Sequence, residues 1–261
     1  MIALLSPAKT LRTLEAPPTE RFTHPALEEH VQELLEVTRP LSAGRLQELM
    51  HISADLGQLN QERFQSIGFP FTPENAHPAV FAFYGDVYRG LEAETLSEAD
   101  LEWSQEHLVI LSGLYGMLRP LDLMQPYRLE MGTRLENPRG KNLYAFWKQV
   151  IAPRLSEQLD AQGDRVVLNL ASNEYFKAVN KKLLGARIIT PVFKDTKDGK
   201  TRIISFYAKT ARGAMARWFV ENRVTDPAAV QDAEVMGYRF DPDLSEGDQW
   251  VFTRLQPPPK S

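Results

Sequence analysis

The sequence contains no cysteine, and this absence removes several classes of chemistry at once. Disulfide bonds, thiolate nucleophiles and cysteine-ligated zinc or iron–sulfur clusters are all excluded. None of the five histidines has the spacing of a paired metal ligand, so we expect no metal site built on histidine. A chain without cysteine also suits a reducing cytosol.

Long apolar runs and nucleotide-binding signatures are also missing. No stretch of about 18 apolar residues exists to span a bilayer, and the apolar run in MIALLSPAKT is too short for a signal peptide. We therefore expect a cytoplasmic protein with no membrane partner. Gly113 and Gly116 do not make a dinucleotide fingerprint, and no phosphate loop of the G-x-x-x-x-G-K-[ST] type occurs, so we expect no cofactor such as ATP or NAD.

What remains has the composition of an ordinary globular protein. The chain has 261 residues, of which 43% are hydrophobic and 25% charged, enough to bury a sizeable core. Helical patterns fill residues 25–107, and strands mix with helices after that. We predict a single domain over residues 1–261, of α/β (mixed α+β) class. It would have a central, mostly parallel sheet, flanking helices and a helical subdomain at about residues 25–107.

Particular elements follow from the pattern of apolar residues and turns. Strands are predicted at residues 2–5, 108–111, 166–170, 187–193, 201–207 and 249–254. The turn at residues 195–200 would join two of these strands as a hairpin. Residues 142–159 predict one long amphipathic helix, interrupted at Pro153, and residues 211–222 predict another helix.

Three of the predicted strands are each followed at once by a polar, turn-rich segment. If these strands are parallel neighbours, their polar ends meet at one edge of the sheet, where open α/β sheets bind ligands. We therefore expect a pocket there; the alternative is three unrelated strand ends. The pocket residues would be Ser6, Lys9, Ser112, Tyr115, Asn169, Ser172, Asn173 and Glu174.

The segment of residues 112–133 is the most unusual of the chain. It combines three glycines and two prolines with Arg119, Asp122, Arg128 and Glu130. Arginine presents a planar fork that matches phosphate or carboxylate, so we favour a ligand-binding loop over a surface loop with incidental charge. Residues 111–116 resemble the turn of a helix-hairpin-helix element, although a strand-to-loop turn explains the same glycines equally well.

The net charge of −4 hides a basic segment. Residues 165–217 contain twelve basic and three acidic residues, a net charge of +9, which leaves −13 for the rest of the chain. Segregated charge of this kind indicates a polyanionic partner. The alternative is a solvated helix face with ordinary surface lysines.

Five segments together resemble the YaaA family of peroxide-stress proteins. They are SPAKT (6–10), SGLYGMLRPLDLMQPYRLEMGT (112–133), NLASNEYFK (169–177), TPVFKD (190–195) and ISFYAKTARGAMARW (204–218). The resemblance implies a cytosolic bacterial protein that limits damage from hydrogen peroxide and free iron. It also implies an α/β fold with a positively charged cleft, a helix-hairpin-helix-like element and binding to double-stranded DNA. It implies no established catalytic reaction.

Three hypotheses remain open on these grounds. In the first, the protein binds double-stranded DNA, and the candidate phosphate contacts are Lys9, Arg119, Arg128, Lys177, Lys181, Lys182, Lys194, Lys209, Arg212 and Arg217. In the second, the strand-end pocket belongs to an enzyme acting on a nucleotide, nucleobase or damaged DNA, with Glu174 as acid or base. The third is direct iron sequestration by carboxylates such as Glu28-Glu29 or Glu92 with Glu94. The first is preferred, and no catalytic residue is assigned.

Overall fold

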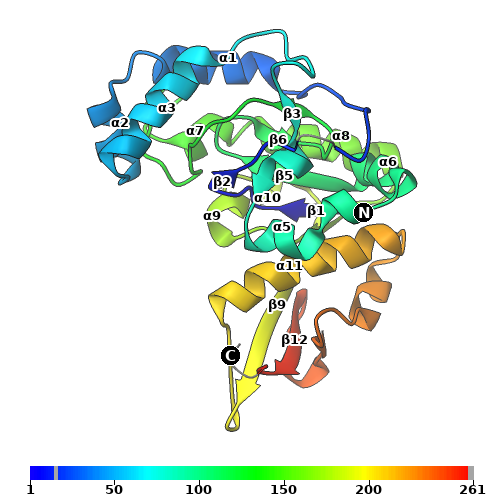
Figure 1. The fold of residues 1–261 in the computed structure, drawn as a ribbon. Helices are drawn as coiled ribbons and strands as arrows, with labels where there is room; N and C mark the ends of the chain where they lie inside the picture. Colours follow the sequence, from blue (N-terminus) through cyan, green and yellow to red (C-terminus); the bar gives the residue numbers. More distant parts are fainter. Residues whose placement is uncertain (15–16, 258–261) are drawn as a thin grey trace.

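The structure, a computed structural model, describes residues 1–14 and 17–257. Its centre is a sheet in which five neighbouring strands run parallel in the order β12-β9-β8-β1-β5 (Figure 1). These strands are β1 (Ile2–Leu5), β5 (Leu108–Ser112), β8 (Val166–Asn169), β9 (Arg187–Lys197) and β12 (Gln249–Leu255). Antiparallel strands extend it: β6 (Gly116–Leu118), β10 (Lys200–Arg202) and β11 (Arg239–Phe240). The predicted mixed α+β class with a mostly parallel sheet is confirmed.

Helices and two small sheets surround this centre. The helices before residue 108 are α1 (Glu28–Thr38), α2 (Ala43–Met50), α3 (Ala54–Ser66), α4 (Ala79–Ala82), α5 (Asp86–Leu91) and α6 (Glu98–His107). Those after it are α7 (Leu143–Trp147), α8 (Ile151–Gln162), α9 (Asn173–Phe176), α10 (Lys181–Leu184) and α11 (Ser205–Glu221). Short 3-10 helices occupy Ala93–Thr95, Pro227–Asp232 and Pro242–Leu244. Strand β2 (Thr10–Leu11) pairs with β4 (Phe83–Tyr84), and β3 (His77–Pro78) pairs with β7 (Leu123–Met124).

The central parallel strands form because their sequences are short, continuous apolar runs. Every residue of β1, β5 and β8 is buried, which is typical of a parallel sheet covered on both faces. Leu4 lies opposite both Val109 and Asn169. The carboxyl ends of these three strands therefore lie at the same edge of the sheet.

Helices α2 and α3 pack against each other as a helical hairpin at one end of the molecule (Figure 1). Ser42 caps α2 by accepting from the Arg45 N–H, and Ser53 caps α3 in the same way. His51 ends α2 in the left-handed conformation, with φ of 53°. The two helices approach closely because Gly57 has no side chain: a Cβ there would lie 2.6 Å from a backbone oxygen of Ala43.

The predicted long helix over residues 142–159 is two helices. The break lies at residues 148–150, between α7 and α8, and not at Pro153. Pro153 sits in the first turn of α8, where proline costs nothing because the first helical N–H groups have no intrahelical partner. The position of the break was therefore predicted wrongly.

The predicted strand over residues 201–207 was also wrong beyond Arg202. The chain turns at Asp198 and Gly199, whose φ angles are 50° and 72°, and β10 ends at Arg202. Helix α11 then begins at Ser205 and packs against α5, α6, β1 and β9. The apolar residues that favoured a strand, Ile203 and Phe206, are 57% and 51% exposed, so they make no sheet core.

Of the two interpretations offered for residues 111–116, the strand turn is the one observed. These residues join β5 to β6 as an antiparallel pair in which Ser112 lies opposite Gly116. Gly116 has φ of 69° and lies under the Trp147 ring. A Cβ on Gly113 would lie 2.0 Å from the Leu129 carbonyl oxygen, so this glycine permits a close backbone approach. The segment is not a helix-hairpin-helix turn.

Candidate functional site

The loops after β1 and β8 are bonded directly to each other. The Ser172 N–H donates to the Ser6 hydroxyl at 2.8 Å, and the two hydroxyl oxygens lie 3.3 Å apart. The Ser6 carbonyl accepts from the Tyr88 hydroxyl of α5 at 3.1 Å. The structure thus brings together two of the three strand ends at this edge, and α5 holds them in place.

The residues expected from the end of β5 are buried beneath this edge. Ser112 bonds the Tyr127 hydroxyl at 2.6 Å and accepts from the Tyr115 N–H at 2.9 Å. The Tyr115 hydroxyl bonds the Gln125 backbone N–H at 2.9 Å and carbonyl at 3.2 Å. Ser112 and Tyr115 are both 0% exposed. They shape the 112–133 segment from inside and do not line an open surface.

Asn169 and Asn173 occupy different environments. Asn169 is buried, accepts from the Ala171 N–H at 3.2 Å and donates to the Thr190 hydroxyl at 3.5 Å. Asn173 is exposed at the start of α9, where its carbonyl accepts from the Lys177 N–H. Asn169 therefore fixes the turn after β8, whereas Asn173 is free to meet a ligand.

Three charged residues form a cluster at the strand ends. The Lys9 ammonium and the Arg128 guanidinium both lie 3.1 Å from the same oxygen, Glu130 Oε1. The Lys9 side chain is 67% exposed, whereas those of Arg128 and Glu130 are 17% and 14% exposed. Within residues 1–14 and 17–257, the second oxygen, Glu130 Oε2, is buried without a hydrogen-bond partner. The cluster is therefore incompletely paired.

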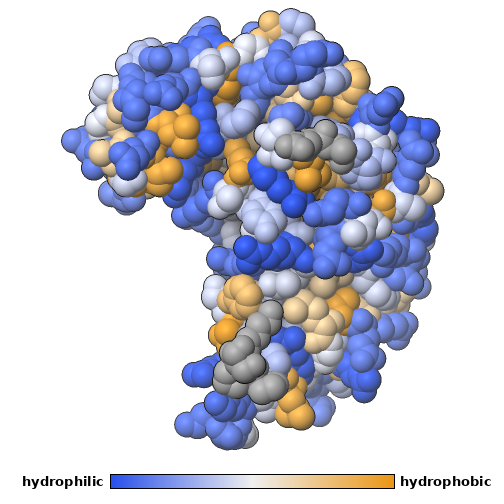
Figure 2. All heavy atoms as spheres, in the orientation of Figure 1, coloured by the Kyte–Doolittle hydropathy of each residue, from blue (hydrophilic) through white to orange (hydrophobic). Residues whose placement is uncertain are grey.

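A recess of about 520 Å³ opens beside this cluster. One wall is the end of α2, and the other comes from the strand-end loops; its lining is Lys9, Leu49, Met50, His51, Glu130, Gly132, Thr133, Arg134 and Glu174. We call it the strand-end recess. Figure 2 shows the molecule hollowed on the side where the α2–α3 hairpin overhangs the rest.

Glu174 is fixed at the edge of the strand-end recess. Its carboxylate accepts from the Gly132 N–H at 3.1 Å, and its carbonyl accepts from the Tyr144 hydroxyl at 3.0 Å. The Lys177 ammonium lies 5.0 Å from the centre of the Tyr144 ring, which places a positive charge near Glu174 at the edge of the strand-end recess. This arrangement makes Glu174 a positioning group for the loop as well as a charged group facing solvent.

A second cavity of about 10 Å³ lies next to the cluster, between Lys9, Glu130, Tyr127 and Tyr175. That volume holds about one water molecule. Burial raises the pKa of Tyr175, and the neighbouring Tyr127, Glu174 and Glu130 raise it further. The phenol is therefore a neutral donor or acceptor at physiological pH.

Arg119 and Arg217, both predicted as phosphate contacts, do not line the strand-end recess. Arg119 pairs with the buried Asp122 at 3.0 Å. Arg217 lies 2.8 Å from Glu221 and donates to the Thr95 hydroxyl and to two carbonyls at the end of α5. Both guanidinium groups are occupied by intramolecular contacts.

The lysines of the basic segment differ from its arginines. Three of these arginines, Arg165, Arg187 and Arg217, pair with carboxylates that lie outside residues 165–217. In the part of the chain that the structure describes, by contrast, Lys9 is the only lysine with a carboxylate within 4.0 Å. The predicted contacts left without a counter-charge are Lys177, Lys181, Lys182, Lys194, Lys209 and Arg212.

Arg212 is the most enclosed of these cations. It lies one turn from Ala208 and Ala216, both buried, along one face of α11. Burial lowers its pKa. Among residues 1–14 and 17–257 it has neither a carboxylate nor a hydrogen-bond partner. A partly desolvated guanidinium without a partner costs free energy, and a bound anion would offset that cost.

Sequence reasoning missed Arg134, in the lining of the strand-end recess, and Arg63, on α3. Arg134 directly follows the 112–133 segment, so extending that segment by one residue would have included it. Arg63 gives no sequence signal, because it is one of several polar residues on an amphipathic helix. The folded chain places it near Arg128, which together with burial lowers its pKa.

Residues 1–14 and 17–257 contain no group of three histidines or carboxylates arranged to hold a metal ion. In the same residues, no helix combines the length and the apolar character needed to cross a bilayer.

The fold and the site define a class: a mixed α+β protein with a charged recess at the carboxyl ends of parallel strands. The family model described as peroxide stress protein YaaA matches residues 1–244 of the chain. The chain therefore belongs to the YaaA family of peroxide stress proteins, as the five segments had indicated. This membership supports a role in peroxide stress.

Proposed function

We propose that this protein protects against peroxide stress by binding double-stranded DNA through the strand-end recess and the basic segment, and so limits iron- and peroxide-driven damage. The observation that carries the proposal is the contrast within the basic segment. Three of its five arginines pair with carboxylates, whereas its lysines have none within 4.0 Å in the described residues. Unpaired lysines are available to phosphates, which they neutralise with release of counterions.

The α2–α3 hairpin supports the same proposal. It overhangs the strand-end recess, so that a bound polyanion would meet the hairpin on one side and the strand-end loops on the other (Figure 1). The family resemblance implies a helix-hairpin-helix-like element, and residues 111–116 do not form it. The α2–α3 hairpin is our candidate for that element. Lys9 is the exposed cation of the cluster on the opposite wall.

The test is the salt dependence of binding to a fluorescent duplex of about 20 base pairs, between about 50 and 200 mM salt. We expect the affinity of the wild type to fall steeply with salt. The double variant Lys181→Ala/Lys182→Ala should bind more weakly, with a log–log salt slope smaller by about 1.8. Lys141→Ala/Lys148→Ala, which removes two exposed lysines outside the basic segment, is the matched control. Affinity that is unmeasurable at low salt, or indifferent to salt, would overturn the proposal.

One observation favours a second candidate, an enzyme acting on a nucleotide, nucleobase or damaged DNA. In the described part of the chain, Glu130 Oε2 is buried without a hydrogen-bond partner beside a cavity of water size. A carboxylate that receives a proton or a base N–H would have this free oxygen. Mass spectrometry of nucleotides and damaged duplexes after incubation tests it. A product made by the wild type and lost in Glu130→Gln supports an enzyme, whereas no product from either supports binding alone.

A further inference from the structure

The β9–β10 hairpin carries a group of cations that lies apart from the strand-end recess. Strand β9 is the longest strand in the described residues, and after Lys197 the chain turns back into β10. Figure 1 shows the end of β9 and the turn that follows it projecting from the lower end of the molecule, away from the α2–α3 hairpin. We call residues 195–202 the β-ribbon.

The β-ribbon is a preformed element and not an irregular loop. Its two strands are joined by only Asp198 and Gly199, whose φ angles are 50° and 72°. A type I′ turn requires positive φ at both positions, and its twist matches that of the paired strands. Across the strands, the hydroxyl oxygens of Thr196 and Thr201 lie 2.8 Å apart in a hydrogen bond. The shape of the β-ribbon is therefore set before any ligand binds.

One face of the β-ribbon is rich in positive charge. Lys197 lies directly opposite Lys200 in the register of the two strands. Arg202 lies opposite Asp195, two positions further along, so these four side chains belong to the same face. Like charges directly opposite each other destabilise a strand pair. Strand pairing therefore gives no reason for two lysines at this place.

The carboxylate on this face, Asp195, is already paired. It is 1% exposed, and its oxygens accept from the Arg254 guanidinium at 2.8 Å and from the Tyr238 hydroxyl at 2.6 Å. In residues 1–14 and 17–257, none of the three cations of the face has a carboxylate within 4.0 Å, and all three are exposed. The face thus presents three positive charges to solvent.

We propose that the β-ribbon enters the major groove of a DNA duplex, where Lys197, Lys200 and Arg202 contact the phosphates that border the groove. This placement rests on the proposed duplex binding and names the element that enters the groove. Paired strands lie about 4.8 Å apart before their side chains are added. They fit the major groove, which is about 12 Å wide, and are too wide for the minor groove of about 6 Å. Lysine and arginine contacts to phosphate fix a protein's position on a duplex without reading its sequence.

The experiment compares two duplexes of one sequence, about 20 base pairs long, one of DNA and one of RNA. The major groove of duplex RNA is deep and too narrow for side chains to read. We expect the wild type to bind the DNA about tenfold more tightly at about 100 mM salt, measured by fluorescence anisotropy. Lys197→Gln/Lys200→Gln should bind DNA about tenfold more weakly, with a log–log salt slope smaller by about 1.8. It should also lose most of the preference for DNA.

The matched control is Lys141→Gln/Lys148→Gln, which removes the same charge from two exposed lysines outside the basic segment and should bind as the wild type does. Because the two lysines of the β-ribbon are exposed and face each other, their replacement should not lower the Tm. A loss of binding in the ribbon variant is then separated from a loss of folding.

Equal affinity of the wild type for DNA and RNA would overturn the placement in the major groove. DNA binding by Lys197→Gln/Lys200→Gln equal to that of the wild type would overturn the role of the β-ribbon, as would an equal loss in the control. In each of these cases, salt-sensitive binding of the DNA duplex by the wild type would leave the proposed function standing. A wild type that binds neither duplex would end both proposals.

Discussion

The 112–133 segment contains two arginine–carboxylate pairs that look alike in the sequence and differ in the structure. In the first, Asp122 is 1% exposed and both of its oxygens are bonded. Oδ1 accepts from the Thr23 hydroxyl at 2.6 Å and from the Arg119 guanidinium, and Oδ2 accepts from the Arg119 N–H at 2.7 Å. In the second, Glu130 Oε1 receives both Arg128 and Lys9, while Oε2 receives nothing within the described residues.

The difference separates a pair that holds distant parts of the fold together from a pair that lies at an open recess. Asp122 ties the segment to Thr23, a distant part of the chain, and burial raises its pKa despite the opposing effect of Arg119. The Glu130 cluster lies at the strand-end recess, and its outermost member, Lys9, is mostly exposed. We therefore expect changes at the first pair to act on stability and changes at the second to act on binding.

The largest expected effect on the free energy of unfolding is that of a substitution at Gly113, which precedes both pairs in the 112–133 segment. In Gly113→Ala the new Cβ would lie 2.0 Å from the Leu129 carbonyl oxygen, so the backbone that carries Arg128 and Glu130 must move. We expect a loss of about 3–4 kcal/mol in the free energy of unfolding, measured by urea denaturation. Gly44→Ala is the control: nothing lies within 4 Å of its Cβ, and alanine in helix α2 should stabilise by about 0.5–1 kcal/mol. Similar losses in both variants would contradict the steric argument.

The comparison itself is tested by removing the carboxylate of each pair. Asp122→Ala leaves Arg119 without its counter-charge and Thr23 without its acceptor, so we expect a loss of about 3 kcal/mol in unfolding free energy. Glu130→Ala should cost less, about 1–2 kcal/mol, because it removes only the contacts of Oε1 with Arg128 and the mostly exposed Lys9, whereas Asp122→Ala removes bonds from both oxygens. Equal costs in denaturation would show that both pairs are structural.

Duplex affinity should respond in the opposite order, with a larger change when Glu130 is neutralised than when Asp122 is. Glu130→Gln removes the one negative charge between Lys9 and Arg128 while keeping the shape of the side chain, so we expect duplex affinity at low salt to rise about threefold. Asp122→Asn should lower stability, but the molecules that remain folded should bind the duplex with unchanged affinity. Fluorescence anisotropy with a labelled duplex measures both. A fall in affinity for Glu130→Gln would show that the carboxylate contacts the ligand or positions Lys9.

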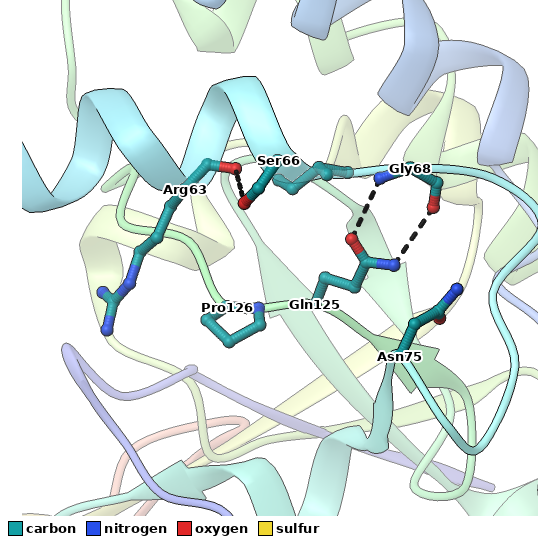
Figure 3. A pocket seen from close by; sticks show the side chains of 7 residues that line it. Arg63, Ser66, Gly68, Asn75, Gln125 and Pro126 are labelled. Carbon is teal, nitrogen blue, oxygen red and sulfur yellow. Dashed lines mark hydrogen bonds between the residues drawn. The ribbon is translucent and has the colours of Figure 1, made fainter.

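The sequence predicted the parts of this molecule that depend on local pattern. The apolar runs located the parallel strands, and their polar ends located the edge where Ser6, Ser172 and the Lys9 cluster lie. It could not separate Arg119 from Arg128, because the difference lies in what distant residues bring to each pair. Arg63 was missed for the same reason, since only the folded chain brings it to one recess with Gln125 and Pro126 (Figure 3).

The smallest effect should be the dependence of stability on pH, and it concerns helix α6, whose Gln105 contacts the Asp122 pair through Thr23. His107 ends α6, two residues after Gln105, whose amide donates to Thr23, the partner of Asp122. Burial lowers the pKa of His107 below its ordinary value of 6.5, despite the nearby Met1 carbonyl. The unfolded chain then binds the proton more readily, so stability is fully present above about pH 6.5 and is lost as the pH falls through that value.

We expect the Tm to fall by a few degrees between pH 7.5 and 5.5, and His107→Gln to flatten this dependence. His30, whose pKa burial and Arg139 also lower, contributes in the same direction, so His30→Gln/His107→Gln should flatten it further. Calorimetry at the two pH values measures the change. A loss of stability at low pH that persists in the double variant would contradict this assignment of the acid sensitivity to the two histidines.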